Sequence, residues 1–314
     1  MEVKMGYLYI LLAGLFWSSI GLFTTNLNNI GLSTEEISFL RLSMGCLILV
    51  LYAIIKNPSL LKISRKGLIY AIIIGILCQG LFNFCYVSSI KNAGSAVAAV
   101  LLYTSPIFLT IFSKIIYKEK INKMKLLSLV ICVVAAILAV TGGSLDLKGI
   151  STFGIISGIM SAILYALMPI ISKNILDEVN NLTIIIYSFL TGALFFIAKV
   201  DFGKVSAGIT DIYVVINIVG FGLLTGALAY IFYTMGVKSG IELSVAGVIA
   251  SIELVFAQMI GWIIMGESCN IVKIIGVCLM VISALIAFKS SSENTKTTEI
   301  DDENLQTIET NDNI

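Results

Sequence analysis

The sequence predicts an all-α membrane protein whose ten transmembrane helices form two inverted five-helix repeats around a central cavity. Three observations predict this fold. The 314 residues are 58% hydrophobic and 12% charged, with a mean hydropathy of +1.01, whereas soluble domains carry roughly a quarter charged residues. The chain contains apolar runs of about 20 residues, the length that crosses a bilayer as a helix. Its two halves also resemble each other.

The predicted spans follow one another with short connections. They lack the alternation of a membrane β-strand, so we interpret them as helices. Ser33 and Glu36 form a capping box at the start of the second span, and Ser151 and Asp211 stand where N-caps would start the sixth and eighth. In chain order the ten spans are expected at residues 6–27, 34–55, 67–90, 93–117, 124–142, 151–174, 181–198, 212–237, 241–265 and 270–289.

The internal repeat is clearest in residues 86–119 and 233–267. Both stretches carry the same residues in the same order at an offset of 147 and then 148: Tyr86, Lys91, Phe108 and Glu119 in the first, and Tyr233, Lys238, Phe256 and Glu267 in the second. Residues 1–147 are expected to form one five-helix repeat and residues 148–289 the other. Because five is odd, the second repeat enters the membrane from the opposite side, as in many secondary transporters.

Lysine and arginine predict the orientation. They are concentrated in the connections that share a side with the N-terminus, and such connections lie in the cytoplasm. We therefore expect a multi-pass protein of the cell membrane, the inner membrane of a bacterium, with both termini cytoplasmic. The tail, residues 290–314, is acidic and polar and is predicted to be disordered.

Several classes of function are disfavoured. The chain has no histidine, which removes histidine proton relays and histidine-based nucleophiles. It also lacks a Walker A motif for ATP and a basic nucleic-acid footprint. We expect no catalytic residues, metal site, cofactor or nucleic-acid partner. The expected partners are the lipid bilayer and a small-molecule substrate, and a homodimer is compatible with the sequence.

Polar residues in the third and eighth spans point to a central cavity. Gln79, Asn83 and Tyr86 share one helical face, and Tyr230 and Tyr233 lie at matching positions of the other repeat. Polar groups inside membranes face cavities because exposure to lipid is costly. Hydrogen bonding between helices is the alternative, at ~0.6 kcal/mol per contact.

Two charges lie inside predicted spans. Glu253, near the middle of the ninth span, costs on the order of 3 kcal/mol on insertion scales unless it is paired, hydrated or protonated. It is either a cation or proton site or a structural carboxyl. Arg41, near the start of the second span, either extends to the interface or receives an anionic group of a substrate.

Further candidates lie in the first, fourth and sixth spans. Trp17 either lines the cavity or packs against neighbours. Tyr103 and Ser105 precede Pro106, which is expected to kink the fourth span. Leu254 occupies the matching position of the ninth span, so this kink is expected in one half only. Pro169 is expected to bend the sixth span.

The chain resembles the EamA-type transporters of the drug/metabolite transporter superfamily over about residues 6–289. The resemblance implies ten helices, cytoplasmic termini, a central cavity and alternating access driven by gradients; family members mostly export amino acids and related metabolites. It rests on Gly14-Leu15-Phe16-Trp17, Phe39-Leu40-Arg41, the run from Tyr103-Thr104-Ser105-Pro106 to Glu119, and the run from Glu253-Leu254-Val255-Phe256 to Glu267.

Two departures weaken what the resemblance implies for gating and substrate choice. Members commonly have Glu-Pro where this chain has Glu253-Leu254, and an aromatic signature where it has Gly158-Ile159-Met160-Ser161. From the resemblance and the polar residues inside the spans, we expect export of a small polar metabolite, an amino acid or a derivative. The alternative is proton-coupled efflux of cationic amphiphiles through Glu253, whose aromatic neighbours suit cation–π binding. A membrane receptor or enzyme is the least favoured hypothesis.

Overall fold

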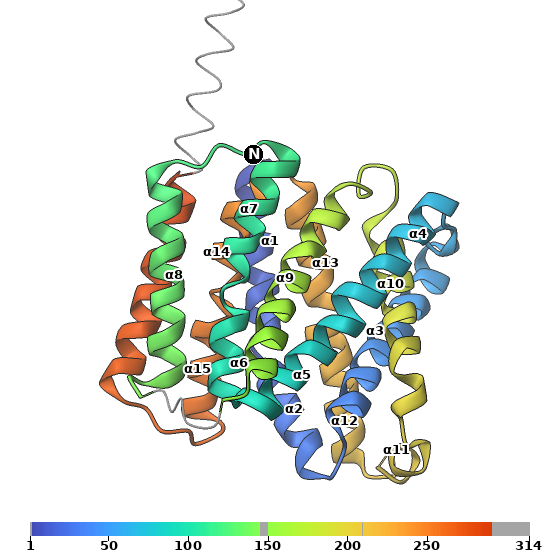
Figure 1. Ribbon diagram of the computed structural model, residues 1–314. Coiled ribbons are helices and arrows are strands. Elements are labelled where there is room, and N and C mark those ends of the chain that lie inside the picture. Colours follow the sequence, from blue (N-terminus) through green and yellow to red (C-terminus); the bar gives the residue numbers. More distant parts are fainter. Residues whose placement is uncertain (1, 145–149, 209, 291–314) are drawn as a thin grey trace, which may run out of the picture.

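The protein is a bundle of membrane-length helices (Figure 1). A computed structural model describes residues 2–144, 150–208 and 210–290, and in these residues all regular structure is helical. Ten helical segments of this part are long and apolar enough to cross a membrane, which confirms the predicted spans to within a few residues. They are α1–α2 (Glu2–Trp17, Ile20–Asn29), α3 (Thr34–Lys56), α4–η2–α5 (Arg65–Ile73, Ile74–Leu81, Phe82–Ala93), α6–α7 (Ser95–Leu102, Ser105–Tyr117), α8 (Lys123–Thr141), α9 (Thr152–Lys173), α10–η3 (Asn181–Phe196, Ile197–Lys199), α12–η4–α13 (Ile212–Gly220, Phe221–Leu228, Ala229–Lys238), α14–α15 (Leu243–Ala250, Glu253–Ile263) and a last helix, Ile271–Ser290.

The predicted helix starts are confirmed. Ser33 and Glu36 form a reciprocal capping box at the start of α3, with the Ser33 N–H donating to the Glu36 carboxylate at 2.6 Å. Ser151 and Asp211 cap α9 and α12 through their side-chain oxygens. Two short helices, η1 (Pro58–Leu61) and α11 (Phe202–Gly208), lie in connections.

The repeats are inverted, as the fifth span of each shows. Ser283 Oγ donates to Ser128 O at 2.6 Å, and Asn270 Nδ2 donates to Gly142 O at 3.1 Å. Residue numbers therefore rise along α8 as they fall along the last helix, so these neighbours run antiparallel (Figure 1). Between these bonds Cys132 Sγ lies 3.7 Å from Met280 Sδ. Residues 132 and 280 are repeat partners, so a pseudo-two-fold axis passes between them.

Both repeats contain a π-helical segment at the same place. η2 covers Ile74–Leu81 and η4 covers Phe221–Leu228, and both ends differ by 147 (221 − 74 and 228 − 81). π-Helical turns are rare and concentrate at functional sites. Because they occur in both repeats, they indicate that the third and eighth spans contribute to the functional site.

Both repeats also contain a break in the span that follows, which corrects a prediction. The fourth span is interrupted between α6 and α7, and the ninth between α14 and α15. At each break some N–H groups bond three residues back, among them Thr104 to Leu101 O and Ile252 to Ile249 O, both at 3.1 Å. The kink expected in one half only therefore occurs in both, although only the first contains proline.

Pro169 lies inside α9 (Thr152–Lys173), and the helix is not interrupted there. A bend at Pro169 stays a prediction. The repeat boundary at 147–148 and the tail beyond residue 290 lie outside the described residues.

The two ends of the bundle are named as follows. The N-terminal face is the end that carries the label N in Figure 1, and the distal face is the other end. The connections at 30–33 and 264–270 lie on the distal face.

Candidate functional site

A cavity of about 390 Å³ extends from the middle of the bundle toward the distal face. Near that face its wall is formed by hydroxyl and aliphatic side chains, including Thr24, Thr25, Thr34 and Ile90. Deeper in, it is lined by aromatic, charged and amide side chains from seven spans. The residues of this inner part are Trp17, Arg41, Asn83, Tyr86, Tyr103, Tyr165, Tyr230 and Glu253.

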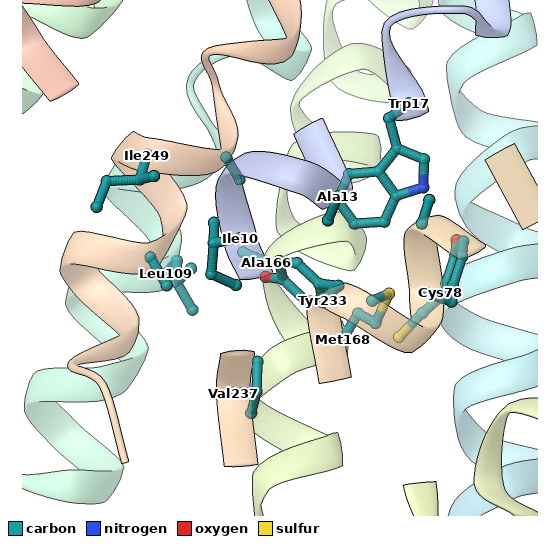
Figure 2. Close-up of a cluster of buried hydrophobic side chains, with 14 of the residues drawn as sticks. Ile10, Ala13, Trp17, Cys78, Leu109, Ala166, Met168, Tyr233, Val237 and Ile249 are labelled. Atoms are coloured by element: carbon teal, nitrogen blue, oxygen red, sulfur yellow. The ribbon is translucent and has the colours of Figure 1, made fainter. Parts of the chain in front are cut away.

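Trp17 ends the cavity toward the N-terminal face. It is the last residue of α1 and is 4% exposed. Its ring centroid lies 5.4 Å from that of Tyr230 and 5.0 Å from that of Tyr233. Figure 2 shows Trp17 and Tyr233 as part of a buried hydrophobic cluster that also includes Ile10 and Val237. Ile10 and Val237, which lie toward the N-terminal face from Trp17, are 0% and 1% exposed and do not line the cavity. Packed side chains therefore bound the cavity on that side.

Gln79 holds Tyr230 in the cavity wall. Gln79 lies in η2 and is fully buried. Its Nε2 donates to Tyr230 Oη at 2.7 Å, and the Tyr230 hydroxyl lies 3.1 Å from Gln79 Oε1. Phe189 packs edge-on against the Tyr230 ring, with centroids 4.9 Å apart. The π-helical segment of the first repeat thus positions a ring of the second.

The break in the ninth span positions Glu253. Because α14 ends at Ala250, Glu253 is the first residue of a new helix, α15. A helix N-terminus carries a partial positive charge that stabilises a carboxylate. Tyr103, at the break of the fourth span, lies within interaction range of the Glu253 side chain, and both line the cavity. The two breaks therefore bring one acidic and one phenolic group to the same wall.

Arg41 supplies the opposite charge. It is 7% exposed and lines the same cavity, and its guanidinium carbon lies 5.7 Å from the centre of the Phe221 ring. Among the described residues, the ion pairs join other side chains, Lys66 with Glu178 and Lys125 with Glu242. Arg41 as a whole is thus more than nine-tenths buried. Its side chain lines the cavity and has an aromatic neighbour, Phe221, in place of a carboxylate among the described residues.

Three of the residues expected to line the cavity lie behind its wall. Gln79 and Tyr233 are buried against the residues that form the wall. Ser105 is 6% exposed and begins α7, next to Pro106. The expected polar faces of the third and eighth spans therefore divide: Asn83, Tyr86 and Tyr230 line the cavity, and the others support it.

Tyr165 of α9 lines the cavity and was missed by sequence reasoning. Its ring centroid lies 6.3 Å from that of Trp17 and 5.6 Å from that of Phe82. The sequence held no signal for Tyr165, because the repeat was recognised over residues 86–119 and 233–267, outside the sixth span. The described part of the chain holds no cluster of three or more acidic, cysteine or histidine residues suited to a metal ion.

Comparisons with known proteins agree with this architecture. The model of the EamA-like transporter family matches residues 4–141 and again residues 152–289, once per repeat. An uncharacterized transporter of Clostridium kluyveri is 25% identical over 304 residues, covering 93% of this chain and 95% of that protein. The pseudopaline exporter CntI of Pseudomonas aeruginosa is 23% identical over 259 residues, covering 81% and 86%. A solved crystal structure has a similar fold, with a TM-score of 0.76, 16% identity, and coverage of 92% of this chain and 98% of that one.

Proposed function

The chain belongs to the EamA-like transporter family, and we propose that it is a secondary transporter that exports a small polar metabolite, an amino acid or a derivative, by alternating access. The observation that carries the proposal is the cavity, which reaches the middle of the bundle from one face and is bounded toward the other by buried side chains such as Ile10 and Val237. A pocket at the middle of two inverted repeats is where secondary transporters bind their substrates.

The charges in the cavity favour an amphoteric substrate. Arg41 suits a carboxylate, to which a guanidinium donates two parallel hydrogen bonds. Glu253 suits an ammonium group, and the aromatic rings around it add cation–π attraction. A charge in a span costs ~2.5–3.5 kcal/mol on insertion scales, so a substrate that carries both opposite charges would offset both costs. Neutral metabolites would offset neither.

Export is supported by two observations. One relative of the chain is named as a pseudopaline exporter. The distribution of lysine and arginine predicts cytoplasmic termini, and with that orientation the cavity opens to the outside of the cell. The conformation described here would then be the one that releases substrate.

Transport by purified protein in proteoliposomes tests the proposal. The panel should hold zwitterionic amino acids, matched amines that lack the carboxylate and matched acids that lack the amine. We expect zwitterions to be transported best. Because a hydrogen bond to a charged group contributes ~1.5–3 kcal/mol, Arg41→Gln should raise their KM about 10-fold to 100-fold. Glu178→Gln, which removes an exposed carboxylate, is the matched control. No transport of any panel member under a proton or solute gradient would refute the proposal.

A second candidate is proton-coupled efflux of cationic amphiphiles. It is favoured by the tyrosine-rich wall and by the contact between Tyr103 and Glu253, since a cation and a proton could compete for this carboxyl. The two candidates differ at Arg41. Under the second one, Arg41→Gln leaves cation transport intact and Glu253→Gln abolishes it.

A further inference from the structure

On the N-terminal face, Glu119 joins the two repeats by capping a helix. Glu119 lies just beyond the end of α7. Its carboxylate accepts hydrogen bonds from the N–H of Leu243 at 2.7 Å and from the N–H and hydroxyl of Ser244 at 3.1 and 2.6 Å. These N–H groups belong to the first turn of α14, which has no partner for them within the helix. The contact therefore ties the fourth span to the ninth on this face.

The symmetric contact on the distal face is absent among the described residues. The repeat partner of Glu119 is Glu267, and the partners of Leu243 and Ser244 are Ser95 and Ala96, at the offset of 148. Glu267 is exposed, and α6 begins at Ser95 without a side-chain cap. An open cavity mouth and an unused cap thus occur on the same face.

The backbone presents the two glutamates in the same way. The N–H of Glu119 bonds to Ser113 O, six residues back, and the N–H of Glu267 bonds to Gly261 O, also six residues back. A Cβ added at Gly261 would lie 2.8 Å from the Glu267 carboxylate, so this side chain lies over the last turn of its own helix. The two faces therefore differ in the contacts of the carboxylates. Glu119 bonds to the start of α14, whereas Glu267 lies against its own helix.

We propose that Glu119 and Glu267 are reciprocal latches of the transport cycle. In the conformation described here Glu119 caps α14 and holds the N-terminal face closed. In the alternate conformation Glu267 caps α6 at Ser95 and Ala96, the distal face closes, and Glu119 releases α14. The inference rests on the alternating access of the proposed function and on the pseudo-two-fold axis, which turns one contact into the other.

The latches are unequal. Ser244 adds a hydroxyl bond that Ala96 cannot make. Lys125 Nζ also lies 2.8 Å from the Glu242 carboxylate at the start of α14, while the repeat partners of these two residues are Lys273 and Gly94, which has no side chain. The N-terminal face is therefore held by more charged contacts than the distal face, and the conformation described here is the more stable one.

Distances between spin labels on each face test the latches in reconstituted protein. The labels are attached at two symmetric pairs of exposed positions, 120 with 238 on the N-terminal face and 91 with 268 on the distal face. These positions are changed to cysteine after Cys269 and Cys278 have been replaced by serine. Glu119→Gln should open the N-terminal pair, close the distal pair and change the population ratio about tenfold, the value of one charge-assisted hydrogen bond. Glu267→Gln should shift the ratio the other way. Ser244→Ala, which makes the two caps alike, should act like Glu119→Gln but more weakly.

The double variant decides between latches and a merely structural carboxylate. If the caps compete, Glu119→Gln combined with Glu267→Gln removes both caps and leaves the ratio between those of the parent and Glu119→Gln alone. It should lie close to the ratio of Ser244→Ala, since each cap shifts the equilibrium by its own difference in affinity. A double variant that matches Glu119→Gln alone would overturn the proposal. Glu178→Gln, on the N-terminal face but outside the contact, should change neither pair. Unchanged distances with intact transport refute the latches alone; responsive distances without transport of any solute refute the proposed function alone.

Discussion

Gln79 and Tyr230 hydrogen-bond to each other across the two repeats, with Gln79 Nε2 2.7 Å from Tyr230 Oη. Gln79 lies inside one π-helical segment, and Tyr230 is the second residue after the other. The bond therefore links two unusual backbone segments that are partners in the repeat. It also fixes the position of a ring in the cavity wall.

Removing one partner of this bond is expected to destabilise the protein. Gln79→Leu and Tyr230→Phe should each lower the free energy of unfolding by ~1–3 kcal/mol, because a buried polar group loses its partner. The double variant should cost less than the sum, with a coupling of ~0.6–1.7 kcal/mol, the range measured within membranes. Unfolding in detergent micelles measures these values. Tyr213→Phe, at a half-exposed tyrosine, is the control, and strict additivity would contradict the prediction.

The proline in the fourth span is expected to be dispensable for the break, since the ninth span breaks at the same place without one. Leu254→Pro, which copies Pro106 into the second repeat, removes the hydrogen bond from the Leu254 N–H to Ser251 O. It should cost only ~0.5–1.5 kcal/mol, because proline is otherwise tolerated in the first turn of a helix. Val134→Pro, at a side chain 43% exposed inside the unbroken helix α8, should cost ~3 kcal/mol or more. Thermal unfolding compares the two, and equal losses would contradict the prediction.

The pseudo-two-fold axis predicts a specific cross-link. Cys132 faces its own repeat partner, Met280, with their sulfur atoms 3.7 Å apart. Met280→Cys should therefore form a disulfide with Cys132 under mild oxidation and join the repeats after proteolysis between residues 144 and 150. Electrophoresis without reductant shows the joined halves. The same substitution combined with Cys132→Ser is the control, and separate halves in both variants would contradict the antiparallel pairing.

Gly154 is expected to be required for close packing of α9. A Cβ added there would lie 2.8 Å from the backbone carbon of Asn92, so Gly154→Ala should cost ~1–3 kcal/mol by overpacking. Gly21 in α2 is the matched control, since a Cβ there meets nothing within 4 Å. Gly21→Ala should stabilise the protein by ~0.5–1 kcal/mol. A gain of stability in both variants, measured by thermal unfolding, would contradict the prediction and show that helix propensity rather than space decides.

The sequence by itself determined the ten spans, the repeat and the helix starts at Ser33, Ser151 and Asp211. These features depend on neighbouring residues, because a span needs a continuous apolar run and a cap needs an oxygen two or three residues before the N–H that it accepts from. The inversion followed from the odd number of spans per repeat. Such local terms can be read without knowing which helices meet.

Only the tertiary structure decided how the polar residues divide between the cavity and its support. Gln79 and Asn83 share a helical face, yet Asn83 lines the cavity and Gln79 bonds to Tyr230 behind the wall. The structure also placed a break in the ninth span without proline, brought Tyr165 to the cavity, and set Glu119 but not Glu267 on a helix start. These outcomes depend on contacts between spans that are far apart in the chain. The free energies of such contacts cannot be predicted from any one stretch of sequence.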